Sequence, residues 1–270
     1  MCIRDRLNHA SLLDGTLLSG ARLHRFAHGD LAMAAQALEG LSPESPRLLV
    51  SDGVFSMEGD CADVAALARL AEQHDTPLMI DDAHGLGVLG AKGAGTLEAQ
   101  SVAAHQVPIL VGTLGKALGT QGAFVAGSHR LIESLIQFAR PFIYTTSLSP
   151  ALASATLAAL DIVETEPERR RHLHHLIQRF RQEVTGRALP GVTLMPSGTP
   201  IQPLLVGGEQ AAMALSERLH EKGILCTAIR PPTVPPGQSR LRVTLSAAHT
   251  DADLDRLLSA LEHCCRTLSP

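Results

Sequence analysis

The stretch VPILVGTLGKALG at residues 107–119 joins an apolar run to a glycine-rich turn that contains one lysine. The run Val107 to Val111 predicts a buried strand. The glycines after it allow the backbone to turn sharply and to lie close to a ligand. Lys116 therefore stands at the exit of a strand, with the hydroxyl of Thr113 three residues before it. This placement suits a lysine that reacts with a carbonyl group beside a bound phosphate.

A second strand exit precedes the lysine, in the stretch LMIDDAHG at residues 78–85. Asp81 and His84 lie three residues apart just past the apolar part of this stretch. A carboxylate and an imidazole so placed could bind the ring nitrogen and the ring oxygen of pyridoxal phosphate (PLP). That cofactor needs a lysine for its aldehyde and a carboxylate for its pyridinium nitrogen, so the two exits together predict a PLP enzyme.

Each motif alone has a simpler interpretation. Asp81 could serve only to cap a strand-to-helix turn, and Lys116 could serve only to bind a phosphate. The lysine does not belong to a Walker loop, because GxxxxGK[ST] is absent and Ala117 follows it. A dinucleotide-binding glycine fingerprint is also absent, which argues against a nicotinamide enzyme. The pairing of the two motifs favours PLP over either simple interpretation.

The composition predicts a globular protein without a charged binding face. Apolar residues make up 45% and charged residues 19% of the 270 residues, which is ordinary for a soluble enzyme. The net charge of -4 offers no basic face for nucleic acid and no polybasic patch for a membrane. The five cysteines show no CxxC spacing and no disulfide framework, which favours a reducing cytoplasm.

The order of the expected elements indicates an α/β fold with a doubly wound, mostly parallel sheet. Strands are expected at residues 47–56, 77–81, 107–111 and 122–126, and a helix at residues 62–74. Both PLP motifs fall at the C-terminal ends of strands, where open α/β sheets bind their ligands. The first six residues, in contrast, predict neither a strand nor a capped helix.

A smaller α+β domain is expected after the sheet, so that residues 1–166 form a large domain and residues 167–270 a C-terminal one. Helices are expected from residues 149 and 167 onward and at 209–222 and 251–266, and strands near 192–195, 201–206, 224–229 and 241–245. Thr250 is the expected N-cap of the last helix.

The histidines outside the PLP motifs are interpreted as having no role in a site. His172, His174 and His175 follow the charged run Glu168–Arg171, so they are expected on a solvated helix face and no metal site is predicted. Six further histidines lack a partner motif: His24, His28, His105, His129, His220 and His263.

Four stretches resemble the α-oxoamine synthases, which are PLP-dependent acyltransferases with the type I aminotransferase fold. These stretches are LNHAS at 7–11, GVFSMEGD at 53–60, DDAHG at 81–85 and TLGK at 113–116, and the resemblance extends from Asp5 to about Arg266. It implies a PLP-binding large domain and a smaller C-terminal domain.

The C-terminal part of the sequence resembles one branch of this family, in the stretches TAIRPPTVP at 227–235 and SRLRVTLSAAH at 239–249. That branch condenses a pimeloyl thioester with L-alanine to give 8-amino-7-oxononanoate, CO2 and the free thiol carrier, in biotin biosynthesis. The resemblance therefore implies L-alanine and pimeloyl-CoA or pimeloyl-ACP as substrates. Another α-oxoamine synthase, similar to glycine C-acetyltransferase, is the alternative.

The resemblance implies cofactor-binding roles for five residues. Lys116 would bind PLP covalently and then act as the base that transfers protons. Asp81 would pair with the pyridinium nitrogen, and His84 and Ser56 would donate hydrogen bonds to the ring oxygen. Thr113 would bind the phosphate.

The resemblance also implies residues for the substrates and for a second subunit. His9 would stack on the cofactor ring and joins Lys116 and Asp81 as a catalytic residue. Arg242 would hold the alanine carboxylate with a bidentate guanidinium, and Thr233 would line the acyl pocket. The stretch YTTS at 144–147, with Thr145 and Thr146, matches one that reaches the phosphate of the other subunit. A homodimer is therefore implied.

Family members carry a segment upstream of the His9 motif that contacts cofactor and substrate. We therefore expect this sequence to be truncated at its N-terminus. Two outcomes are open for the chain itself: the synthase activity, or an inactive piece that binds PLP weakly or dimerises.

Overall fold

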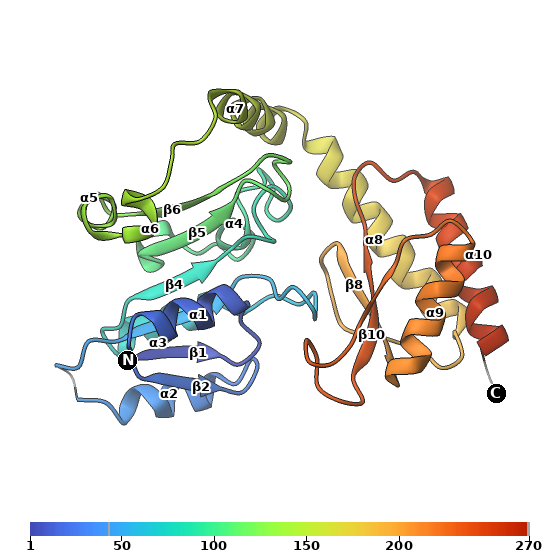
Figure 1. The fold of residues 1–270 in the computed structure, drawn as a ribbon, viewed down its shortest axis with the longest axis horizontal. Helices are drawn as coiled ribbons and strands as arrows, with labels where there is room; N and C mark the ends of the chain where they lie inside the picture. The colour runs from blue at the N-terminus through green and yellow to red at the C-terminus, as the bar shows by residue number, and fades with distance from the viewer. Residues whose placement is uncertain (43, 269–270) are drawn as a thin grey trace. The chain divides into compact units, whose positions relative to one another are not determined.

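The computed structural model describes residues 1–42 and 44–268, which divide into two compact units (Figure 1). The first unit contains Met1–Phe55 and Cys61–Pro167. The second contains the short segment Ser56–Asp60 together with the chain from Glu168 onward. Each unit has a sheet of its own.

The first unit is built on a six-stranded sheet in the order β2-β1-β3-β4-β5-β6. The strands are β1 (Cys2–Asp5), β2 (Leu23–Phe26), β3 (Leu48–Asp52), β4 (Leu78–Asp81), β5 (Ile109–Thr113) and β6 (Ala123–Gly127). Neighbouring strands are parallel except β5 and β6, which are antiparallel. The carboxyl ends of β1, β3, β4 and β5 therefore meet at one edge of the sheet, where doubly wound folds bind ligands.

Short helices cover this sheet and form its core. They are α1 (Ala10–Leu18), α2 (Leu31–Glu39), α3 (Val64–Gln73) and α4 (Thr96–Ala99), followed by the 3-10 helix η1 (Ala104–Gln106). Leu38 of α2 and Leu67 of α3 pack in one buried cluster with Leu49 and Ile80 of the sheet. Burying each such side chain contributes roughly 1.5–3 kcal/mol. The periodicity that predicted α3 reflects this buried face.

The N-terminal residues contradict the expectation that they form neither strand nor capped helix. Cys2–Asp5 is a strand buried at all four positions, and it pairs with both β2 and β3. His9 caps α1, because its Nδ1 accepts from the backbone N–H of Ser11 at 3.3 Å. The strand has only four residues and includes the charged Arg4 and Asp5, so it lacks the apolar run by which buried strands are recognised.

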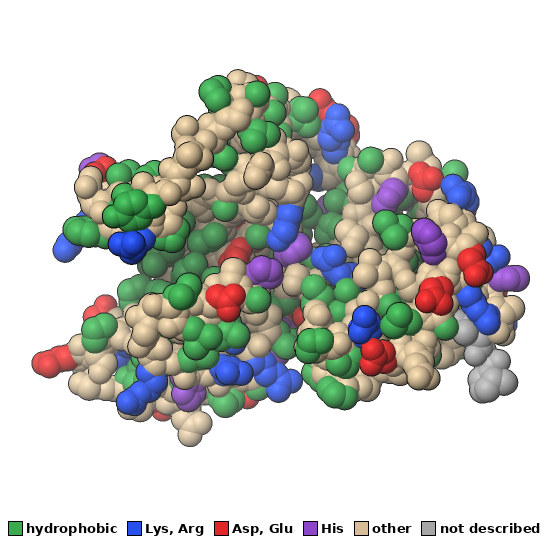
Figure 2. Space-filling view, in the orientation of Figure 1, with side chains coloured by type: hydrophobic (Ala, Val, Ile, Leu, Met, Phe, Trp, Pro, Cys, Tyr) green, Lys and Arg blue, Asp and Glu red, His purple; other side chains and the backbone are tan. Residues whose placement is uncertain are grey.

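The last helices of the first unit carry apolar side chains that stay exposed. They are α5 (His129–Phe138), α6 (Arg140–Ile143) and α7 (Pro150–Thr165), and none of their described residues is buried. Phe138 is 80% exposed and Leu157 is 65% exposed. Figure 2 shows hydrophobic side chains gathered over α5 and α6. Exposed apolar patches of this kind often mark sites where another protein binds.

The second unit is an antiparallel sheet with three helices. Its strands follow the order β7-β8-β10-β9. The elements are α8 (Pro167–Arg187), β7 (Thr193–Leu194), β8 (Ile201–Gly207), α9 (Glu209–Glu221), β9 (Thr227–Ile229), β10 (Ser239–Thr244) and α10 (Asp251–Leu268). The hydroxyl of Thr250 accepts from the backbone N–H of Asp253 at 3.1 Å, the bond that an N-cap makes.

The predicted fold class is confirmed: a mostly parallel α/β sheet and a smaller α+β part. Most expected helices and strands occur within a few residues of their predicted bounds. In the part of the chain that the structure describes, no helix is long and apolar enough to cross a membrane.

Candidate active site

Two adjacent carboxylates at the end of β4 face different surroundings. Asp82 is buried, and its carboxylate accepts from the backbone N–H of Thr96 at 2.7 Å and from the Thr96 hydroxyl. Gly95 packs against it with a φ of 92°, and a Cβ there would lie 2.0 Å from Asp82 Oδ2. Burial raises the pKa of Asp82 to about 6. Asp82 therefore holds the start of α4 and leaves no room for a ligand.

Asp81 is half-buried and has a carboxylate oxygen to spare. Its Oδ1 accepts from the backbone N–H of Ala83 at 3.0 Å, and the described residues supply no other hydrogen bond to this side chain. The alternation of side chains along a strand separates Asp81 from the buried Asp82. Asp81 is thus the carboxylate of this pair that could bind a cationic ring nitrogen.

Lys116 and His84 meet at this edge of the sheet. Lys116 Nζ lies 2.9 Å from His84 Nε2. An ammonium can donate this bond only if His84 Nε2 carries a lone pair, so the two groups are not both protonated in this arrangement. Upstream in the same turn, Thr113 Oγ1 accepts from the backbone N–H of Gly115 at 3.2 Å. An amine, an imidazole and a hydroxyl thus follow the ends of two neighbouring parallel strands.

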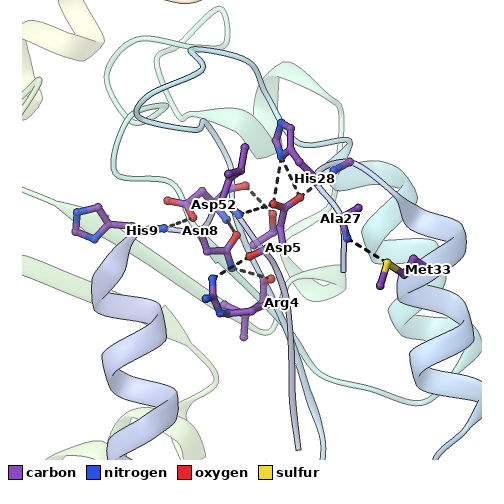
Figure 3. A network of polar contacts seen from close by, with 12 residues as sticks. Arg4, Asp5, Asn8, His9, Ala27, His28, Met33 and Asp52 are labelled. Carbon is purple, nitrogen blue, oxygen red and sulfur yellow. Dashed lines mark hydrogen bonds and ion pairs between the residues drawn. The ribbon is translucent and has the colours of Figure 1, made fainter. Parts of the chain in front are cut away.

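The ends of β1 and β3 are joined through His9 and Asp52 (Figure 3). The backbone N–H of His9 donates to Asp52 Oδ2 at 2.9 Å. The pKa of Asp52 is raised to about 7, chiefly by burial and also by the charge of Asp81, while the bond from His9 and the positive charge of Lys116 oppose the rise. Asp52 was not among the predicted site residues. Asp52 follows the apolar residues of β3 as Asp81 follows those of β4. This shared placement is the sequence signal from which Asp52 could have been predicted.

His28 has no partner motif in the sequence, but the structure gives it two partners. Its Nδ1 lies 3.1 Å from Asp5 Oδ2, and its ring meets the edge of Phe55 with the centroids 4.4 Å apart. Burial alone would raise the pKa of Asp5, but hydrogen bonds from His28, Leu7 and Gly29 hold it below its ordinary value. The partners are far apart in the sequence, so no local motif revealed them.

The remaining first-unit candidates, Thr145 and Thr146, are exposed in the loop between α6 and α7. The described residues make no hydrogen bond to either side chain. Their proposed contact with a second subunit therefore stays a prediction.

Two arginines on β10 of the second unit differ in how their guanidinium groups are bonded. Arg240 is 1% exposed and donates to Glu58 Oε1 at 3.1 Å. Arg242 donates through Nε to the Ser56 carbonyl at 2.7 Å, and no described residue accepts from its two terminal nitrogens. Burial lowers the pKa of Arg242. Arg242 therefore offers a free pair of N–H groups of the kind that binds a carboxylate.

The predicted residues thus fall into two groups. His9, Asp81, His84, Thr113 and Lys116 lie at strand ends of the first unit, along one edge of its sheet. Ser56, Thr233 and Arg242 belong to the second unit, where Thr233 is exposed. What these three contribute to the strand-end site stays a prediction.

Known proteins place this fold in a family. Residues 3–261 match the sequence profile of the family "Aminotransferase class I and II". The chain belongs to this family. Two relatives, the 8-amino-7-oxononanoate synthases of Stutzerimonas stutzeri and Pseudomonas entomophila, are each 58% identical over 262 residues. These matches cover 97% of this chain and 66% of each relative, so the chain spans about two thirds of their length.

Solved structures of similar aminotransferase-family enzymes share the fold. The 8-amino-7-oxononanoate synthase of Francisella tularensis has a TM-score of 0.83 at 32% identity, and the match covers 99% of this chain and 75% of that one. The serine palmitoyltransferase of Sphingomonas wittichii has a TM-score of 0.94 at 30% identity, covering 99% and 66%. The predicted type I aminotransferase fold is therefore confirmed.

The strand-end residues of this aminotransferase-family chain fit PLP chemically. Lys116 is exposed and supplies a primary amine for an aldehyde. Asp81 keeps one carboxylate oxygen for a ring nitrogen, and His84 supplies a ring N–H or lone pair beside the amine. The Thr113 hydroxyl lies in the same turn as the lysine and is a group that can bind a phosphate. These groups are the ones that the cofactor requires.

Proposed function

We propose that this chain belongs to a PLP-dependent 8-amino-7-oxononanoate synthase, which condenses a pimeloyl thioester with L-alanine. The observation that carries the proposal is the 2.9 Å contact between Lys116 Nζ and His84 Nε2 at the sheet edge that also holds Asp81. The 58% identity to synthases of that name supports the choice of reaction. On this proposal residues 1–166 form the PLP-binding domain and residues 167–270 the small domain.

The cofactor side of the reaction rests on first-unit residues and on Ser56 of the second unit. PLP, when bound, supplies an electron sink for the electrons left on the substrate carbon. Lys116 holds the cofactor covalently and then takes and returns the proton at the alanine α-carbon. The free oxygen of Asp81 keeps the ring nitrogen protonated, which preserves the sink. His84 and Ser56 bind the ring oxygen, and Thr113 binds the phosphate.

The substrate side rests on His9 and on second-unit residues. The ring of His9 stacks on the cofactor and fixes its plane. The free N–H groups of Arg242 bind the alanine carboxylate as a planar fork, which a lysine could not reproduce. Thr233 lines the acyl pocket for the pimeloyl group of pimeloyl-CoA or pimeloyl-ACP. The deprotonated alanine α-carbon would attack the thioester carbonyl, so that a C–C bond forms while the C–S bond breaks and the carrier leaves as a free thiol. Loss of the alanine carboxylate as CO2 and protonation of that carbon would then give the product.

The enzyme is proposed to be a cytoplasmic homodimer. The exposed apolar side chains of α5–α7 support a protein partner, and Thr145 and Thr146 lie in the loop between α6 and α7. The five free cysteines fit a reducing compartment. Light scattering after gel filtration tests the dimer: Leu157→Glu should weaken self-association. Leu225→Glu, at an 89% exposed leucine of the second unit, is the matched control and should not.

The function is tested with the purified chain, PLP, L-alanine and pimeloyl-CoA. We expect a visible absorption band from bound PLP and alanine-dependent release of free thiol. Borohydride reduction followed by peptide mapping should place the cofactor on Lys116. A PLP band without thiol release would identify binding without turnover, and the absence of both would contradict the proposal.

The competing candidate is the activity of a different α-oxoamine synthase. The similarity to a serine palmitoyltransferase structure supports this candidate. Substrate pairs separate the two. L-alanine with pimeloyl-CoA should give the fastest thiol release. Faster thiol release with L-serine and a long-chain acyl-CoA would assign serine palmitoyltransferase activity instead. Faster release with glycine and acetyl-CoA would assign glycine C-acetyltransferase activity.

A further inference from the structure

The turn between β1 and α1 is held by two buried carboxylates, one at each of its ends (Figure 3). Asp5 accepts from the backbone N–H of Leu7 at 2.8 Å, and Asp52 accepts from the backbone N–H of His9 at 2.9 Å. Asn8 lies between them and donates to the carbonyl of Val50 at 3.1 Å. The turn that presents His9 is thus attached to the neighbouring strand β3 by side-chain bonds.

Asp52 is buried at a cost that its own hydrogen bonds do not offset. Its side chain is 4% exposed, and within the described residues only Oδ2 accepts a hydrogen bond. Asp82, which is equally enclosed, has both oxygens bonded by Thr96. Burying a carboxylate with a single hydrogen bond costs free energy. Its presence at a ligand-binding sheet edge therefore requires a functional explanation.

The hydrogen bond to Asp52 restrains the backbone of His9, and contacts with Ser11 restrain its ring. The imidazole Nδ1 lies 2.8 Å from Ser11 Oγ and accepts from the Ser11 backbone N–H. The backbone N–H is held by Asp52, so the residue is fixed at both its main chain and its ring. Figure 3 shows the His9 ring directed away from the polar network that anchors its backbone. That ring is exposed and available to a ligand.

We propose that Asp52 is a positioning residue that fixes His9 at the sheet edge, so that its imidazole can stack on the bound cofactor. The inference rests on the proposed function for the role of the ring. The anchoring itself involves only residues of the first unit. Asp52 touches the backbone of His9 and acts on the cofactor through it.

Hydrogen exchange tests the anchor without cofactor or substrate. Exchange of the peptide covering residues 7–13 is compared with that of α3 in the same chain, which reports the stability of the unit. Asp52→Ala removes the acceptor, and Asp52→Leu removes it while keeping a side chain that branches at Cγ. Both should speed exchange of the turn by about tenfold or more relative to α3, because an anchoring hydrogen bond is lost. Asp52→Asn keeps an acceptor and should restore exchange to within about threefold of the parent.

Bound PLP gives the second measurement. If His9 stacks on the cofactor, visible circular dichroism should change in the same direction for His9→Ala, Asp52→Ala and Asp52→Leu, whereas Asp52→Asn should keep the parent signal. Asp82→Asn is the matched control at the next strand and should alter neither measurement. Unchanged exchange of the turn in both Asp52→Ala and Asp52→Leu would overturn the proposal. Altered exchange without PLP binding would overturn the proposed function and leave the anchor standing.

Discussion

The two units place their charged side chains in opposite ways. The first unit buries carboxylates at strand ends, among them Asp52 and Asp82. The second unit buries the guanidinium of Arg240, whereas the side chains of Asp251 and Glu262 are partly exposed and pair with arginines. Burial raises the pKa values of Asp52 and Asp82, whereas ion pairs lower the pKa values of the surface carboxylates Asp251 and Glu262.

The two buried carboxylates differ in what they hold: Asp82 is bonded to the start of α4, and Asp52 to the backbone of His9. Surface ion pairs contribute little to stability each, so the second unit can carry many of them without a specific role. Burial of carboxylates is costly, and it occurs in the first unit at the sheet edge where ligands bind. We therefore expect changes at Lys116 and Asp81 to alter cofactor chemistry. Changes on β10 should alter substrate affinity while the cofactor stays bound.

The largest effect is expected from Lys116→Ala. Loss of the amine removes the covalent bond to PLP, so the visible band and the thiol release should both disappear. Lys92→Ala is the control, because Lys92 is exposed and lies outside the strand-end group. Peptide mapping after borohydride reduction checks the assignment. A label on Lys92 or Lys222 would show that another lysine holds the cofactor.

Asp81→Asn should have the second-largest effect, because an amide cannot keep the ring nitrogen of PLP protonated. We expect turnover to fall by about 100-fold or more, the usual effect of removing such electrostatic stabilisation, with some PLP still bound. Asp82→Asn is the matched control, since Thr96 can bond an amide in place of the carboxylate. It should keep turnover within about threefold of the parent. Equal losses in the two variants would contradict the distinction between these neighbours.

The sequence predicted the parts of the fold that rest on local patterns. The apolar runs before Asp81 and Thr113 indicated parallel strands. Because the C-terminal ends of parallel strands lie at the same edge of a sheet, the sequence then placed Lys116 and Asp81 at one edge. The helical spacing of Val64 and Leu67 likewise predicted α3, because one face of that helix is buried.

Residues joined across long stretches of sequence were missed. His28 meets Asp5 through the pairing of β1 with β2, and Asp52 meets His9 through the pairing of β1 with β3. Such contacts depend on strand order, which no local motif encodes. The strand β1 itself was missed because two of its buried residues, Arg4 and Asp5, are charged. The His28 and Gly29 bonds that satisfy Asp5 come from the loop after β2.

In the second unit, Arg242→Lys should weaken alanine binding while the PLP band stays unchanged. The lysine keeps the charge but loses the planar fork, which corresponds to about 1–3 kcal/mol for charge-assisted hydrogen bonds. The alanine KM should therefore rise by roughly 5- to 150-fold. Arg240→Lys is the contrast, because Arg240 is bonded within the unit to Glu58 and should mainly lower the melting temperature. An unchanged alanine KM in Arg242→Lys would place the carboxylate site elsewhere.

The smallest effect concerns how stability depends on pH, and it should have opposite signs in the two units. Burial raises the folded-state pKa of Asp82 to about 6 and of Asp52 to about 7, above the values of about 4 in the unfolded chain. The folded first unit thus binds more protons between pH 4 and 7, so its free energy of unfolding should fall as the pH rises through that range. Asp251 of the second unit has a lowered pKa, chiefly from its bond with Arg179, so its contribution is present above about pH 4 and is lost below it.

Urea unfolding at several pH values measures both signs. Asp82→Asn removes one titrating group and should flatten the fall between pH 4 and 6 by at most about 1.4 kcal/mol per pH unit, the slope for one proton. Asp251→Asn should leave that range unchanged and flatten the loss of stability below pH 4. If Asp82→Asn kept the parent slope, the carboxylate would have to titrate at its ordinary pKa despite its burial. The contrast between buried and paired carboxylates would then not govern how this protein responds to acid.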